Sequence, residues 1–137
     1  MSAEPRQALY AHLLADPSVR EAVGEQVYQR RVEKKRLDLP VRKPLIIVWP
    51  PISNVPVRDL NGVIHRRCRL QVTCMADKQP EAEKAARAVI AAVEGFTGVM
   101  AGALNVVQAT VDNDRQVDQE GVDEIHHHID ILITYKE

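Results

Sequence analysis

The sequence predicts an α+β fold: a mainly antiparallel sheet of about four strands, helices packed on one face, and a long projecting loop. With 137 residues, 45% of them hydrophobic, the chain is long enough for one core and short for two, so we expect a single domain over residues 1–137. Prolines and glycines divide it into segments with helical or strand-like periodicity. Helices come first and strands follow around one further helix, an order typical of helices packed on a sheet.

The opening segments have helical patterns. Pro5 suits the first turn of a helix, and residues 5–15 continue it with Leu9, Leu13 and Leu14 on one face. Asp16 followed by proline is typical of an N-cap, and predicts a second short helix that ends at Gly24. Residues 25–36 are either a loop or an edge strand.

Four later segments predict strands, and one predicts the main helix. Residues 44–51 are a β-branched apolar run between prolines, which indicates a strand buried on both faces. Residues 64–76 alternate and predict a strand with one wet, basic face. The main helix begins at Gln79 and runs to Gly95. The sheet is completed by strands at residues 104–111 and 125–135.

The remaining segments are predicted as connections. Residues 50–63 contain three prolines and predict a long turn-rich loop. Its apolar residues have little prospect of burial in their own subunit, so we expect the loop to project and dock on a partner, the alternative being a loop folded back over its own core. These residues are Ile52, Val55, Val57 and Leu60. Residues 96–103 predict a glycine-containing loop, and residues 112–124 an acidic turn.

Charge is divided unequally along the chain. Residues 1–75 carry 13 basic and 7 acidic side chains, whereas residues 76–137 carry 5 and 12. The two halves either fold against each other or meet between identical subunits, because a head-to-tail contact needs two different, complementary patches. For the second case the expected subunit interface joins a basic group to an acidic group. The basic residues are Arg30, Arg31, Lys34 and Lys35, and the acidic residues are Asp112, Asp114, Asp118 and Glu120.

Catalytic and metal-binding patterns are weak. His126, His128 and Asp130 alternate on one strand face and resemble a divalent-metal set, but no third histidine or cysteine stands at metal spacing, so we expect a solvated face. The serines lie in no nucleophile turn, and no Gly-rich loop carries the Lys-Ser/Thr of a nucleotide site. Cys68 and Cys74 are expected to be buried thiols. We therefore expect no enzyme activity, cofactor or metal; a metal-dependent enzyme that uses the histidine face is the alternative.

A second alternative is a basic nucleic-acid-binding module. Residues 30–43, joined by Arg66, Arg67 and Arg69, form a basic surface of the kind that attracts phosphate. Only five aromatic residues are available for base stacking, and no helix-turn-helix or RNA-motif signature is present. The polar N-terminus and the lack of a long apolar run predict neither a signal peptide nor a membrane span, and hence a cytoplasmic site of synthesis and folding.

The order and spacing of several segments resemble a known family. They are the helix at residues 8–14, the turn at Val23-Gly24 before Val27-Tyr28, the strand at 44–48, the strand at 69–76, the helix at 82–89 and the closing strand that ends in Tyr135. Together they resemble the tail-completion, or tail-terminator, proteins of long-tailed bacteriophages. Residues 50–63 and the triple histidine depart from the family pattern.

This resemblance implies a structural virion protein without catalytic residues or a cofactor. It implies a hexameric ring at the head-proximal end of the tail tube that ends tube growth and joins the tail to the head connector. The implied partners are other copies of the chain, the tail-tube protein and the connector protein, with DNA passing through the lumen unbound and no membrane involved. The implied location is the tail or neck of the virion, after assembly in the host cytoplasm.

Overall fold

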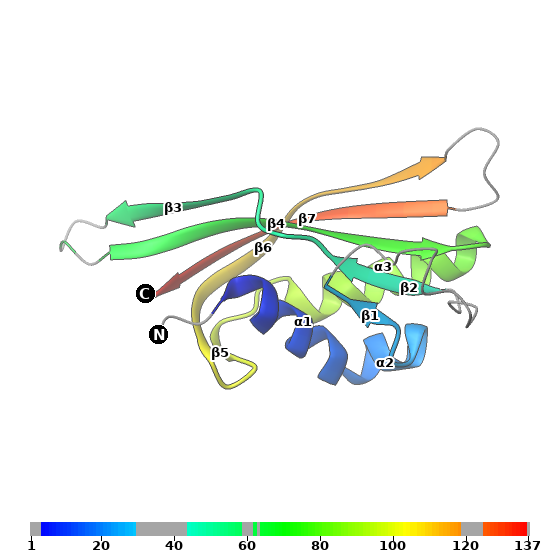
Figure 1. The fold of residues 1–137 in the computed structure, drawn as a ribbon, viewed down its shortest axis with the longest axis horizontal. Helices are drawn as coiled ribbons and strands as arrows, with labels where there is room; N and C mark the ends of the chain where they lie inside the picture. Colours follow the sequence, from blue (N-terminus) through cyan, green and yellow to red (C-terminus); the bar gives the residue numbers. More distant parts are fainter. Residues whose placement is uncertain (1–3, 30–43, 59–61, 63, 119–124, 137) are drawn as a thin grey trace.

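The computed structural model describes residues 4–29, 44–58, 62, 64–118 and 125–136. Three helices and seven strands follow one another in these ranges (Figure 1). In chain order they are α1 (Pro5–Ala15), α2 (Pro17–Val23), β1 (Val27–Tyr28), β2 (Leu45–Val48), β3 (Ser53–Arg58), β4 (Ile64–Ala76), α3 (Gln79–Val93), β5 (Gly98–Met100), β6 (Leu104–Asp118) and β7 (Ile125–Lys136).

The strands form one mixed, curled sheet, and the predicted four-stranded antiparallel sheet is therefore wrong. Its seven strands run in the order β1-β2-β4-β7-β6-β5, and β3 also pairs with β4. β1 is parallel to β2, whereas every other pair is antiparallel. The expectation left residues 25–36 open between a loop and an edge strand, and β1 is that edge strand. It contained no strand at β5, which holds only three residues and shows no alternation of its own.

The segment predicted as the 50–63 loop contains a strand. β2 and β3 both pair with β4, Val48 opposite Val72 and Ser53 opposite Arg69, so residues 49–52 lie opposite only residues 70 and 71. Residues 49–52 form a bulge between β2 and β3, which pair with the same side of β4, and Pro50 and Pro51 stand in it. Pro56 lies inside β3 but on the edge of the sheet, where a residue without an N–H is tolerated. The prolines thus interrupt and border a strand rather than form a turn.

The acidic turn predicted at residues 112–124 is also corrected. β6 continues to Asp118 and pairs with β7 as far as Ile125, with register shifts between Val106 and Gln108 and between Val111 and Asn113. The second shift falls at Asp112. Residues 112–116 are all polar and all exposed, so this part of β6 lacks the alternation that identifies a strand.

The core lies between the helices and one face of the sheet. β4 alternates as predicted, with Cys68, Leu70, Val72 and Cys74 fully buried beneath the helices. The main helix α3 contributes its alanine-rich stripe, and α1 contributes Leu9 and Leu13. The predicted run at residues 45–48 is buried at every position, as expected. Within the described ranges no helix has the length and apolar character needed to cross a bilayer.

The predicted helix pair is confirmed. The Asp16 carboxylate accepts hydrogen bonds from the backbone N–H groups of Ser18 and Val19, at 2.9 and 3.1 Å, and Gly24 ends α2 with a φ of 65°. Asp16 therefore ends one helix and caps the next, and this fixes the bend between α1 and α2.

We expect both thiols to be inert in the folded protein. Burial raises the pKa of Cys68 to about 11 and that of Cys74 to about 12, so the reactive thiolate is scarce at pH 8. An aromatic disulfide reagent at pH 8 should label neither cysteine until denaturant is added, and then both. Rapid labelling of the native chain would contradict this burial.

Candidate assembly surfaces

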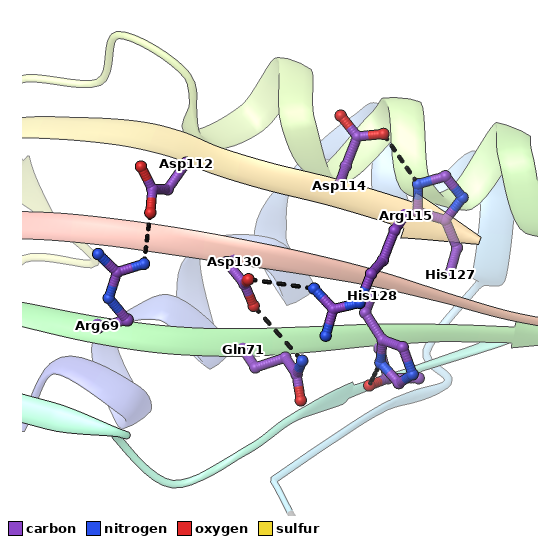
Figure 2. Close-up of polar contacts among 9 residues, drawn as sticks. Arg69, Gln71, Asp112, Asp114, Arg115, His127, His128 and Asp130 are labelled. Atoms are coloured by element: carbon purple, nitrogen blue, oxygen red, sulfur yellow. Dashed lines mark hydrogen bonds and ion pairs between the residues drawn. The ribbon is translucent and has the colours of Figure 1, made fainter. Parts of the chain in front are cut away.

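The face of the sheet away from the helices carries a network of paired polar side chains (Figure 2). Arg69 on β4 forms an ion pair with Asp112 on β6, and this hydrogen bond raises the pKa of Arg69. Asp130 on β7 accepts hydrogen bonds from Arg115 at 3.3 Å and from Gln71 at 3.4 Å. The network therefore ties β4, β7 and β6 together across the middle of the sheet.

Thr73 connects this network to the bulge after β2. The Trp49 indole N–H donates to Thr73 Oγ1 at 2.8 Å, and the Thr73 hydroxyl lies 2.9 Å from His128 Nδ1. The Thr73 hydroxyl can accept from Trp49 and still either donate to Nδ1 or accept from it, so the direction of this bond depends on the His128 tautomer. Burial lowers the pKa of His128, and the positive charge of Arg115 lowers it further. Both effects favour the neutral imidazole.

The metal set considered from the sequence does share one face. The rings of His126 and His128 lie with centroids 6.1 Å apart, but Asp130 is engaged by Arg115 and Gln71, and His128 by Thr73. Within the described part of the chain no three His, Cys, Asp or Glu side chains form a metal-binding group. These three residues are thus arranged as members of the polar network.

His127 points to the opposite face of the sheet, as Figure 2 shows. Its Nε2 lies 3.3 Å from an Asp114 carboxylate oxygen, and among the described residues its buried Nδ1 has no partner. Asp114 itself is exposed near the end of β6.

The opposite end of the sheet is formed by β3 and the start of β4. Arg66 donates to the Asn54 side chain at 2.8 Å and to its backbone carbonyl at 3.1 Å, and Asn54 donates to the buried Tyr135 hydroxyl at 2.9 Å. This trio fixes β3 to the body, while Ile52 and Val55 remain 61% and 48% exposed. Val57 is half-buried.

The predicted interface and docking residues are only partly described. Asp112, Asp114 and Asp118 lie on β6. Five of the predicted interface positions fall outside the described residues, namely Arg30, Arg31, Lys34, Lys35 and Glu120, and so does Leu60 of the docking set. Of the docking set, Ile52 lies in the bulge, whereas Val55 and Val57 lie on β3.

Several residues of these surfaces were missed from the sequence. Arg69 was placed on the wet face by alternation, but its partner Asp112 was assigned to a turn. Trp49, Asn54 and Arg115 gave no local signal, since their partners lie at least 12 residues away in the sequence. The one clue in the sequence to the contact between Arg115 and Asp130 was their opposite charge.

Comparison with known proteins identifies the class to which this chain belongs. One solved chain with this fold comes from the virion of a native gene transfer agent (GTA) particle: the TM-score is 0.78 at 18% identity, covering 97% of this chain and 95% of that one. At that identity the likeness establishes the fold alone. The family model of the tail completion protein gp17 matches residues 7–136, and the chain belongs to this family. No curated protein matches it.

Family membership confirms the resemblance drawn from the segment order. The chain is a structural component of a virion tail, and it assembles with other virion proteins. Structural virion proteins of this kind are generally not enzymes.

We predict that stability falls in mild acid because of His128. Its folded-state pKa lies below 6.5, so as the pH falls past 6.5 the unfolded chain binds the proton first and the free energy of unfolding decreases. Below the folded-state pKa, His128 is protonated in both the folded and the unfolded chain, and the free energy of unfolding falls no further on its account. Urea unfolding of wild type and His128→Gln between pH 8 and pH 5 measures this: the variant should have the flatter profile. Parallel profiles would show that His128 is not the group responsible.

We predict that Asn54→Ala destabilises the chain by about 1–3 kcal/mol, because Arg66 loses an acceptor and Tyr135 a donor in a partly buried site. The matched control is Ser53→Ala, an exposed neighbour on the same strand, which should change stability by less than about 0.5 kcal/mol. Urea midpoints provide the comparison, and equal midpoints for the two variants would refute the role of the trio.

Proposed function

We propose that this chain forms a hexameric ring at the head-proximal end of the tail tube, ends tube growth there and joins the tail to the head connector. One observation supports the ring most directly: the two ends of the sheet differ in charge. Residues 53–69 carry four arginines and one aspartate, whereas residues 112–128 carry six carboxylates and one arginine. β3 and the start of β4 lie at one end of the long axis, and the end of β6 and the start of β7 lie at the other (Figure 1). Arg69 and Asp112, at the inner ends of the two segments, form an ion pair with each other.

Such a molecule favours head-to-tail association. A head-to-tail contact brings the basic end of one copy to the acidic end of the next. Repeated contacts of this kind close into a ring when the rotation between neighbours divides a full turn.

The proposed subunit interface includes the segment that joins β1 to β2. Arg30, Arg31, Lys34 and Lys35 of one copy would face Asp112, Asp114, Asp118 and Glu120 of the next. Each exposed pair contributes only about 0.2–1 kcal/mol, so these charges set register and orientation rather than hold the ring alone. DNA would pass through the lumen without specific binding.

The proposed docking surface is the exposed apolar side of the bulge and β3. Ile52 and Val55 are both largely exposed although the Asn54 trio holds their backbone in place. A pre-ordered apolar surface loses little entropy on binding. We propose that it contacts the tail-tube protein or the neighbouring ring of the connector.

We predict that Val55→Asp prevents tail joining while the isolated chain keeps its stability to within about 1 kcal/mol, since Val55 is 48% exposed. The control is Val55→Ile, which keeps an apolar surface and should keep joining. The measurement is the yield of joined particles in an in vitro complementation with tails that lack this protein, alongside thermal unfolding. If Val55→Asp particles join at the wild-type yield, the docking role fails.

A further inference from the structure

We infer that the docking surface on β3 continues across the open face of the sheet to β5 and β6, and that it receives an acidic segment of another virion protein. The open face is the one away from the helices, and the segment carries an aliphatic side chain beside its carboxylates. This inference rests on the proposed function and names the chemistry of the partner that the docking surface binds.

Two rows of side chains cross the open face at the β3 end of the sheet. In the first row Val55 on β3 lies opposite Arg67 on β4. In the second row Lys136 on β7 lies between His65 on β4 and Asn105 on β6. Arg67, Lys136 and Asn105 each stand next to a residue that is buried under the helices, so their side chains point to the open face. The ends of these strands lie together in Figure 1.

The two rows contain a pair of exposed cations. Arg67 and Lys136 are diagonal neighbours on adjacent strands, a spacing of about 7–8 Å. Among the described residues neither side chain has an ion-pair or hydrogen-bond partner. Arg69 and Arg115, farther along the same face, each pair with an aspartate of their own subunit. Positive charge at this end of the face is therefore available to a partner.

Exposed valines border the cations on both sides. Val55 lies on the β3 side and is 48% exposed. On the other side Val107 is 37% exposed, at the first register shift of β6, and Val99 is 56% exposed on β5, opposite Asn105. All three side chains would lose apolar surface to water-free contact if a partner covered this end of the face.

An open hollow of about 380 Å³ lies beside Lys136. Its other lining residues are Gly98, Asn105, Val106 and Val107. A Cβ at Gly98 would meet no atom within 4 Å, so the glycine leaves this space open, and its φ of 108° favours glycine there. The hollow therefore has room for an aliphatic side chain next to the Lys136 ammonium group.

Charge and apolar surface together select the occupant. The two cations attract carboxylates or phosphates, but the valines beside them gain only from contact with apolar atoms. A protein segment with acidic and aliphatic side chains satisfies both, whereas the DNA backbone satisfies only the cations. A second copy is less suited, because Asp112 and Asp114 on its β6 already pair with Arg69 and His127.

The test measures binding of the purified full chain to two probes in separate pelleting assays: tails that lack this protein, and heads that carry the connector. Val99→Asp should weaken binding to one of the two probes by at least about tenfold, because it puts a carboxylate in an apolar contact. Lys136→Glu should weaken binding to the same probe by about threefold to tenfold. Raised salt should weaken binding of wild type more than that of Lys136→Glu.

Matched controls separate the surface from general effects of substitution. Val99→Ile and Lys136→Arg keep the apolar and positive character and should bind as wild type does. Lys78→Glu makes the same charge change at an exposed lysine before α3, on another part of the molecule, and should also bind normally. Thermal unfolding verifies the fold of each variant, and it should be close to wild type because these side chains are exposed.

Three results would overturn the inference. The first is wild-type affinity for both probes in folded Val99→Asp or folded Lys136→Glu. The second is a loss of binding confined to a duplex DNA probe, which would make DNA the occupant. The third is a loss confined to self-association in sedimentation velocity, which would make a second copy the occupant. The proposed function fails by a different result, namely wild-type protein that binds neither tails nor heads.

Discussion

The pairing of β4 with β7 is the constraint on which the rest of the molecule depends. Twelve residue pairs run without a shift from His65 opposite Lys136 to Ala76 opposite Ile125. Because side chains alternate along paired strands, this register places one set of apolar residues under the helices and one set of polar residues on the open face. A slip of one residue would exchange the two faces, and would bury Arg69 and Asp130 while exposing Leu70 and Ile131. The helices and the outer strands are additions to this central pair.

On the face of the sheet away from the helices, polar side chains in the middle of the sheet are paired with one another. Thr73 is only 2% exposed although it lies on the face away from the helices, because Trp49 from the bulge covers it. A hydroxyl buried to that degree needs partners, and it has two, Trp49 and His128. Farther along the face Arg69, Asp112, Arg115 and Asp130 are paired across strands rather than left to solvent. Asp112, which the proposed subunit interface includes, is therefore already paired with Arg69 within the subunit.

Elements that depend on contacts between residues close in the sequence were predicted correctly, and elements that depend on contacts between distant residues were not. The Asp16 cap, the α3 stripe and the alternation of β4 depend on neighbours in sequence, and each was correctly predicted. The two mistaken connections have different causes. A bulge with two prolines at residues 49–52 interrupts the strand pairing and resembles turn chemistry. Residues 112–116 are polar and exposed throughout, so no alternation identifies them as strand. Contacts such as Asn54 with Tyr135, 81 residues apart, have no local signature. The family resemblance succeeded because it used the order of segments, which these bulges do not change.

The distribution of hydrogen-bonding groups relates the fold to the proposed assembly. A curled sheet that does not close on itself must leave edges, and this chain covers most of them: β1 and β5 are short, and Glu94 to Phe96 cover β6 as far as Val111. The two ends of the sheet bear opposite charge, with exposed Arg58 and Arg67 at the β3 end and exposed Asp114 near the end of β6. If they only needed protection from aggregation, like charge at both ends would serve as well and would repel other copies. Opposite charge instead favours one partner and one orientation, while Pro56 keeps the attraction weak. This combination suits a subunit that must remain separate in solution and join its neighbours at a particular place.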